Sequence, residues 1–217
     1  MAENVFHGLE LTPESGHVKQ LYILLHGVGA RPTDLLPLAN MLRGAFPSAS
    51  FLLPQGTFAF EGGGDGRQWF SIRGVTEENR ILRVAEAMPE LFDLVKREQI
   101  RFNVLPRDTI LMGFSQGAIM ALEFSIVHDG SVGRVVSFSG RFARLPERAP
   151  EFTKVHLLHG EIDPVISVAH AQAGFERLVK LGGNPTLDLA SSAGHEISAV
   201  LGDRAARRLQ TSLSSRS

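Results

Sequence analysis

The sequence predicts an α/β protein in which a mostly parallel sheet is covered by helices on both faces. Short apolar runs alternate along the chain with longer stretches of helical spacing, and most of the runs end at Gly, Pro or His. The runs are apolar at successive positions, as in strands that are buried on both faces. The chain has 217 residues, 43% of them hydrophobic, which suffices for one core. We therefore expect residues 1–217 to form a single domain.

The strands are expected where the apolar runs lie, at residues 18–25, 50–53, 109–114, 134–138, 155–158 and 186–189. Helical spacing predicts helices at residues 33–46, 76–99, 116–128, 167–181 and 196–213. Thr76, which two glutamates follow, is typical of a helix start, and Gly182 with Gly183 is typical of a helix end. Pro89 should kink or split the second helix, because proline lacks the backbone N–H that a helix interior needs.

Residues 54–75 form the least regular stretch, and we interpret them as a long functional loop, because no pattern of a second domain precedes them. The stretch contains a glycine cluster at residues 62–66 and the only tryptophan, Trp69. A phosphate-binding function of these glycines is disfavoured, because no Gly-Lys-Ser/Thr follows them. Trp69 and Phe70 are candidates for contact with substrate in a pocket, and ordinary packing is the alternative interpretation.

The composition excludes several classes of function. The 22 basic and 23 acidic residues nearly cancel, so the chain has no strong field to gather DNA, RNA or an anionic membrane, and we expect no nucleic-acid partner. The chain has no cysteine, which excludes disulfides, thiolate metal sites and a catalytic thiol. His156 and His159 would point to opposite faces of their strand, so histidine spacing predicts no metal site either.

Residues 1–16 mix acidic and apolar side chains and lack both the basic start and the apolar run of a signal peptide. The longest apolar stretches, at residues 21–25 and 110–112, are far shorter than the ~20 residues that a membrane-spanning helix needs. We therefore expect a cytoplasmic protein without a membrane span.

The strongest local signal is Gly113-Phe114-Ser115-Gln116-Gly117, which lies directly between an expected strand and an expected helix. In this context G-x-S-x-G is typical of a nucleophile elbow, where small neighbours permit a sharp turn that lifts the serine hydroxyl above the sheet. Ser115 is therefore the candidate nucleophile. The plainer alternative is a serine that only caps the helix after it.

A serine nucleophile needs a base, and His195 is the candidate because it lies in a loop of small residues after the last expected strand. In proteins with such an elbow, the acidic partner falls between the serine and the histidine in the chain. Asp163 fits that order in a loop after a strand, and its carboxylate would orient the imidazole. Glu161 is the nearest rival, and a turn former before Pro164 is the alternative interpretation of Asp163.

Acyl transfer also needs donors that face the oxyanion. The backbone N–H of Gln116 directly follows the candidate nucleophile and is the first candidate donor. The second is the backbone N–H of Val28, in an early loop after a strand whose glycines allow the backbone to approach substrate. His26 in that loop is interpreted as structural and not as a second base.

These segments together resemble the phospholipase/carboxylesterase family of small α/β-hydrolases, which includes the acyl-protein thioesterases. The resemblance extends over nearly the whole chain, and the residues that carry it are 25–29, 113–118, 159–165 and 194–195. Within the family, residues 66–71, 76–80 and 114–123 look most like the bacterial YpfH-type serine esterases.

The resemblance implies a compact α/β-hydrolase fold without a large lid domain. It implies that Ser115, Asp163 and His195 form a catalytic triad, that no cofactor takes part, and that the substrate is a small-molecule ester with a short acyl group. Val165, close to Asp163 in the chain, is then a further candidate for contact with substrate. The resemblance also allows a weak homodimer, which nothing in the composition requires.

Two alternatives stay open. The same groups would cleave a thioester or a lysophospholipid, although Ala30 and Ser71 stand where the thioesterase branch usually or often has aspartate, which disfavours protein depalmitoylation. The second alternative is a non-catalytic ligand-binding protein on a hydrolase scaffold, which the fold by itself does not exclude. The complete set of candidate triad residues argues against it.

Overall fold

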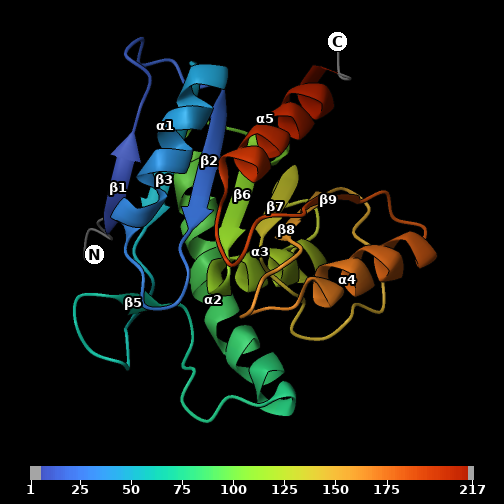
Figure 1. The fold of residues 1–217 in the computed structure, drawn as a ribbon. Helices are drawn as coiled ribbons and strands as arrows, with labels where there is room; N and C mark the ends of the chain where they lie inside the picture. The colour runs from blue at the N-terminus through green and yellow to red at the C-terminus, as the bar shows by residue number, and fades with distance from the viewer. Residues whose placement is uncertain (1–5, 215–217) are drawn as a thin grey trace.

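The computed structural model describes residues 6–214. Residues 1–5 and 215–217 lie outside the described residues. The predictions for the single domain at residues 1–217 and for the N-terminal segment at residues 1–16 include these residues and to that extent lie outside the description as well. The strands of the main sheet follow the order β1-β3-β2-β6-β7-β8-β9. Their bounds are β1 Gly8–Leu11, β2 Gln20–Leu25, β3 Ala49–Pro54, β6 Thr109–Phe114, β7 Arg134–Phe138, β8 Lys154–Gly160 and β9 Thr186–Ala190. β1 is antiparallel to β3, and the other neighbours pair in parallel (Figure 1).

Helices cover both faces of this sheet (Figure 1). They are α1 Leu36–Ala45, α2 Glu77–Phe102, α3 Gln116–Val127, α4 Val168–Lys180 and α5 Ala199–Ser214, with short 3-10 helices at Pro32–Leu35 and Pro106–Asp108. Successive side chains of a strand point to opposite faces. Tyr22 and Leu24 of β2 accordingly pack in one apolar cluster with α1 and α5, while Leu21 and Ile23 pack in a second with α2, α3 and α4. The predicted fold class, a mostly parallel sheet between helices, is confirmed.

Three short strands, β1, β4 and β5, were not predicted from the sequence. β1 alternates between exposed and half-buried residues at the edge of the sheet, so it lacks an apolar run. β4 (Phe58–Ala59) and β5 (Arg67–Gln68) form a small separate sheet within the long loop at residues 54–75. Pro89 does not split α2, which continues through it. Ala85, whose carbonyl loses its helical partner at Pro89, is exposed as Pro89 is, so water can satisfy that carbonyl.

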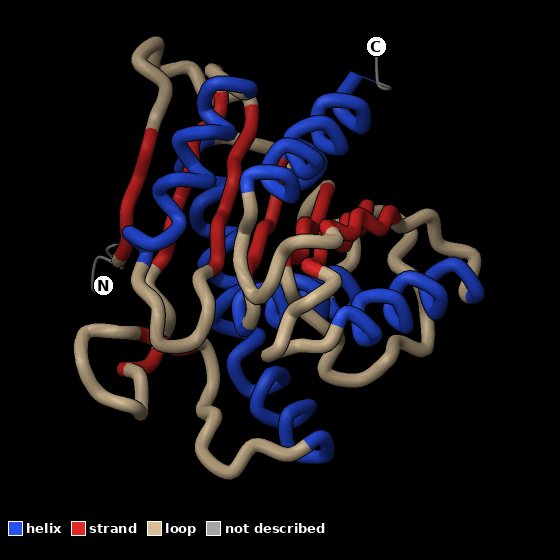
Figure 2. Tube along the Cα trace, viewed as in Figure 1, coloured by secondary structure: helices blue, strands red, loops and turns tan. Residues whose placement is uncertain are grey.

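The loops that follow the parallel strands gather at one edge of the sheet, where Figure 2 shows them as tan segments. In open sheets of this kind, ligands bind at the carboxyl ends of the strands. The loops after β2, β6, β8 and β9 carry the residues that the sequence singled out for chemistry. Within residues 6–214, none of the helices combines the length and the apolar character that a membrane crossing requires.

Candidate active site

The backbone turns sharply at Ser115, between β6 and α3. Its φ of 53° and ψ of −114° are rare for a residue with a side chain. Two glycines make the turn possible: a Cβ at Gly113 would lie 2.2 Å from the carbonyl oxygen of Gly117, and a Cβ at Gly117 would lie 2.2 Å from that of Leu25. The backbone N–H of Ser115 donates to the carbonyl oxygen of Phe138 at 3.0 Å. The turn has the geometry of a nucleophile elbow.

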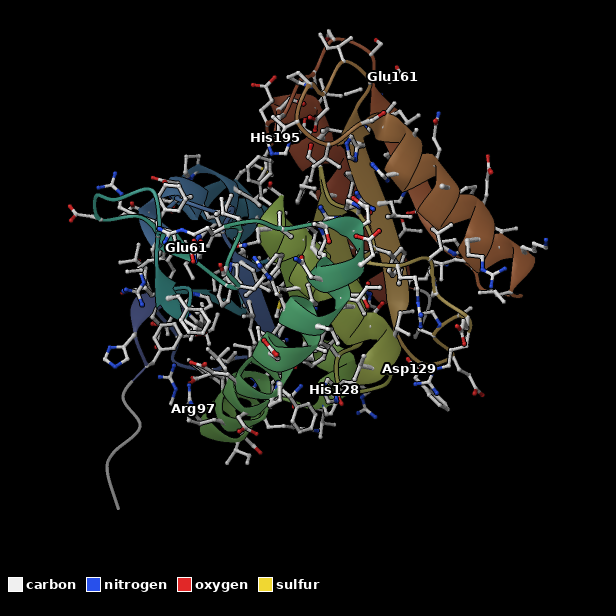
Figure 3. The ribbon with its side chains drawn as sticks, turned by 90° about the horizontal axis from the view of Figure 1, so that it is seen from below. Glu61, Arg97, His128, Asp129, Glu161 and His195 are labelled. Atoms are coloured by element: carbon white, nitrogen blue, oxygen red, sulfur yellow. The ribbon has the colours of Figure 1, made fainter. Side chains whose placement is uncertain are left out.

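Ser115, His195 and Asp163 meet at the carboxyl edge of the sheet. Figure 3 views this edge from below and labels His195. The Nε2 atom of His195 lies 2.9 Å from the Oγ atom of Ser115, and its Nδ1 atom lies 2.7 Å from the Oδ2 atom of Asp163. The loops of the acid and the base pack backbone against backbone, because a Cβ at Gly160 would lie 2.2 Å from the carbonyl oxygen of Ala193. The structure thus joins the three predicted residues in one hydrogen-bonded series.

The carboxylate of Asp163 is buried and accepts several hydrogen bonds. Its Oδ1 atom accepts from the backbone N–H groups of Val165 at 2.8 Å and Ile166 at 2.9 Å, while its Oδ2 atom faces His195. Burial raises the pKa of Asp163, but the hydrogen bonds from His195 and from the two amides outweigh burial and hold this pKa below its usual range. Asp163 is therefore ionised and able to stabilise an imidazolium at His195.

His159, at the end of β8, is a second histidine beside the same carboxylate, and no functional role was predicted for it from the sequence. Its side chain is 1% exposed, and its Nε2 atom lies 2.8 Å from the carbonyl oxygen of Ile166 and 3.3 Å from the Oδ2 atom of Asp163. A carbonyl oxygen only accepts, so Nε2 carries the proton. Burial is the largest influence on the pKa of His159 and lowers it. The neutral ring of His159 thus contacts Asp163 and binds the loop that carries it, and adds no charge to the site.

The position of His159 is the only signal by which the sequence could have revealed it. The residue ends a strand on the edge where the loops meet, four residues before Asp163. The second histidine of that strand, His156, faces away to the hydroxyl of Thr186, at 2.8 Å from Nδ1. Among residues 6–214, no group of three or more His, Cys, Asp or Glu side chains is arranged to hold a metal ion.

The two candidate oxyanion donors lie on segments that pack against each other. Gln116 is the first residue of α3, and Val28 follows Gly27, whose added Cβ would lie 3.4 Å from the Cβ of Ser115. In the described part of the chain, neither backbone N–H has a hydrogen-bond acceptor within the protein. Free N–H groups beside a nucleophile can receive the negative oxygen of a tetrahedral intermediate. The assignment of Val28 and Gln116 stays a prediction.

The side chain of Gln116 ties the long loop to the elbow. Its Oε1 atom accepts from the backbone N–H of Trp69, and its Nε2 atom donates to the carbonyl oxygen of Phe70, both at 2.8 Å. The indole N–H of Trp69 donates to the carbonyl oxygen of His26 at 2.8 Å. Trp69 and Phe70 are each 4% exposed, so they offer little surface to a substrate, whereas Val165 is 67% exposed. Contact of these three residues with substrate stays a prediction.

His26 uses both ring nitrogens for the backbone. Its Nδ1 atom lies 2.7 Å from the carbonyl oxygen of Gly27, and its Nε2 atom accepts from the backbone N–H of Gly56 at 3.0 Å. Burial lowers the pKa of His26, which agrees with a neutral ring that donates once and accepts once. His26 therefore joins the loop after β2 to the long loop and has no nitrogen left to act as a base, in agreement with the structural role expected for it.

The fold and the serine-centred site define a protein of the α/β-hydrolase class. A sequence profile described as Phospholipase/Carboxylesterase matches residues 8–212, and the chain belongs to this family. Esterase YpfH of Escherichia coli (strain K12) is 44% identical over 179 residues, which cover 82% of this chain and 77% of that protein. Acyl-protein thioesterase 1 of Saccharomyces cerevisiae is 26% identical over 178 residues, which cover 75% of this chain and 78% of that protein.

Solved structures resemble the whole fold. Esterase PE8 superposes with a TM-score of 0.87 at 30% identity, over 95% of this chain and 98% of that chain. The Bacillus cereus carboxylesterase has the same fold, with a TM-score of 0.80 at 19% identity, over 97% of this chain and 96% of that chain. By its family the chain is a carboxylic ester hydrolase, and the interpretation as a non-catalytic binding protein is disfavoured.

Proposed function

We propose that the protein hydrolyses short-acyl carboxylic esters through an acyl-enzyme on Ser115, with His195 as general base and Asp163 as the residue that orients it. The observation that carries the proposal is the unbroken series of short contacts from the Ser115 hydroxyl through the His195 ring to the Asp163 carboxylate. A serine hydroxyl is a weak nucleophile unless an adjacent base takes its proton. The 2.9 Å contact between Oγ and Nε2 supplies that base.

In the first half of the reaction, the Oγ atom of Ser115 bonds to the carbonyl carbon of the ester while its proton passes to Nε2 of His195. The carbonyl oxygen becomes an oxyanion, which the backbone N–H groups of Val28 and Gln116 receive. The bond from carbon to the alcohol oxygen then breaks, and His195 gives its proton to the departing alcohol. In the second half, the oxygen of a water molecule bonds to the acyl carbon while a proton of the water passes to His195. The bond from that carbon to Oγ then breaks, His195 returns the proton to Oγ, and the carboxylic acid leaves.

The test uses a fluorophosphonate, which labels an activated serine whatever its natural substrate. We expect intact mass to show one adduct and peptide mapping to place it on Ser115. Ser115→Ala should lose the adduct and lower kcat on a short-acyl ester by at least about 10⁴-fold. Ser192→Ala, at an exposed serine close to His195 in the chain, should keep both. Wild-type turnover by Ser115→Ala, or no adduct on folded wild-type protein, would refute the proposal.

A substitution tests the base. His195→Ala leaves the hydroxyl of Ser115 without an adjacent proton acceptor, so kcat on the same ester should fall by at least about 10⁴-fold. Wild-type turnover by this variant would contradict His195 as the base.

Thioester cleavage is the second candidate, favoured by the similarity to acyl-protein thioesterase 1. An oxygen ester and a thioester with the same acyl group separate the two candidates, and we expect the larger kcat/KM on the oxygen ester. Cleavage of lysophospholipids, the single-domain extent of residues 1–217, a cytoplasmic location and a weak homodimer all stay predictions, as does a small-molecule ester as substrate.

A further inference from the structure

A cleft opens between α1 and the start of α5, which lie side by side on one face of the sheet (Figure 1). Its volume is about 660 Å³, within the range of small-molecule sites. Its apolar lining comes from the α1 region, the start of α5 and the end of β6: Leu35, Leu38, Met41, Phe114, Ile197 and Ala199. The sequence did not reveal this cleft, because its two main walls are far apart in the chain.

The cleft is continuous with the reacting groups. His195 and Gly27 border it, and the ring of Phe114 in its wall lies 4.9 Å from the ring of His195, between centroids. His195 must return its proton to the departing alcohol, so the alcohol oxygen has to lie within hydrogen-bond reach of Nε2. The part of the substrate beyond that oxygen therefore begins beside His195, where the cleft begins.

The charges on the cleft all have one sign. Asp34, Glu196 and Asp203 lie among its lining residues, which include no lysine or arginine. Asp34 is partly offset by Arg31, at 3.9 Å. Both histidines that line the cleft, His26 and His195, are neutral in the resting state of the proposed mechanism. An anionic group placed there would meet carboxylates at close range, whereas a cation would be attracted to them.

We infer that this cleft binds the alcohol part of the ester, and that it selects alcohols that are apolar and uncharged or positively charged over alcohols that carry a negative charge. The inference rests on the proposed function, because it needs His195 as the group that protonates the leaving alcohol. It assigns the substrate class by the alcohol part, which the family alone does not. Lysophospholipids with an anionic headgroup should accordingly be poor substrates.

The test compares acetate esters that differ only in the alcohol. Benzyl acetate is the neutral reference, and ring-substituted benzyl acetates carry either a trimethylammonium or a carboxylate group. We expect kcat/KM to be about tenfold larger for the cationic ester than for the anionic one at low salt, and the ratio to shrink at high salt. Equal values, or a preference for the anionic ester, would overturn the inference.

Paired variants locate the effect. Glu196→Gln combined with Asp203→Asn should reduce the cation-to-anion ratio to about twofold, because two of the three lining carboxylates are gone. Glu176→Gln removes an exposed carboxylate on α4, outside the cleft, and should keep the wild-type ratio. A ratio that the double variant leaves unchanged would overturn the assignment of charge selection to this cleft.

A filling variant tests which arm of the ester occupies the cleft. Ala199 is exposed at the first turn of α5, so Ala199→Leu should fold and should narrow the cleft. We expect KM for benzyl acetate to rise about tenfold more than KM for ethyl acetate. If the variant instead alters the response to longer acyl groups in a series of ethyl esters, the cleft binds the acyl part and the inference is wrong.

Fluorophosphonate labelling of Ser115 and turnover of ethyl acetate separate this inference from the proposed function. If labelling and turnover both persist while kcat/KM does not depend on the charge of the alcohol, only the inference fails. If both are absent in folded wild-type protein, the proposed function fails and the inference falls with it.

Discussion

The two sides of Ser115 are built in opposite ways. On one side, the loop at residues 54–75 is closed against the elbow: Trp69 and Phe70 are almost fully buried, and Gln116 binds the backbone of both. On the other side, α1 and α5 leave a cleft of about 660 Å³ that reaches His195. Trp69 and Phe70 therefore pack against the elbow, while Phe114 and aliphatic residues of the α1 region and the start of α5 border the open space.

An apolar side chain near a nucleophile can therefore support the elbow without forming a substrate pocket. A buried aromatic residue that is hydrogen-bonded on its backbone fixes the geometry of the catalytic groups, and a half-buried aliphatic residue beside a cleft affects which substrates fit. Variants on the closed side should therefore change kcat for every ester, and variants on the open side should change selectivity among alcohols.

The largest effect is expected on the closed side, from Gln116→Leu. The backbone N–H of residue 116 remains, but the N–H of Trp69 and the carbonyl of Phe70 lose their partners. Each buried group left unpaired costs about 1–3 kcal/mol, so the loss of both partners should lower the free energy of unfolding by about 2–6 kcal/mol. Displacement of the elbow should lower kcat by about tenfold to a hundredfold on all esters. Denaturant unfolding and kinetics on ethyl and benzyl acetate measure both.

The matched control for this variant is Gln99→Leu. Gln99 is buried and donates to the hydroxyl of Thr109 and the carbonyl oxygen of Ser131, away from the site. It should lose stability to a similar extent and keep the wild-type kcat. Equal losses of kcat in the two variants would mean that Gln116 acts only through global stability.

A smaller effect is expected from His159→Leu, at the end of β8 beside the carboxylate of Asp163. The change removes the N–H that donates to the carbonyl oxygen of Ile166 and lies 3.3 Å from the carboxylate of Asp163. The loop that holds Asp163 is then less well fixed, so kcat should fall about tenfold with KM unchanged. His159→Gln can still donate from its amide and should recover part of the loss. His156→Gln, at the buried histidine of the same strand that faces Thr186, should keep the wild-type kcat. A rise in KM with unchanged kcat in His159→Leu would contradict an action through Asp163.

The smallest effect is expected on the open side, from Met41→Ala. Met41 is half-buried in the cleft wall, and its Cε atom would lie 2.9 Å from a Cβ at Gly202. Removal of its side chain widens the cleft, so kcat/KM should rise about threefold for esters of alcohols bulkier than benzyl alcohol, and the ratio to ethyl acetate should rise with it. A uniform change across the alcohol series would show that the cleft does not distinguish them.

The sequence predicted the parts of the site that depend on short, contiguous patterns. The elbow residues follow one another in the chain, and Asp163 and His195 each lie in a loop directly after a strand, so chain order and strand ends were enough to choose them. The parallel strands were predictable for the same reason, because burial on both faces gives continuous apolar runs. Edge strand β1 could not be predicted in this way, because it is partly exposed and has no continuous apolar run.

What the sequence could not supply depends on contacts across the fold. The role of His159 rests on a hydrogen bond whose geometry exists only when the loop after β8 folds back. The same holds for the side chain of Gln116, whose partners are 46 and 47 positions away in the chain. The cleft is the extreme case, since α1 and α5 belong to opposite ends of the chain and only the sheet brings them together.

The glycines under the site have a consequence for how this enzyme can evolve. At Gly117 and Gly160, a methyl group would collide with a backbone oxygen of another segment of the site, so a substitution there displaces two segments at once. Ala199, which is exposed, and Met41, which is half-buried, border the cleft. Inherited variation should therefore accumulate around the cleft and be purged from the glycines, which lets a lineage change its substrates while its chemistry stays fixed.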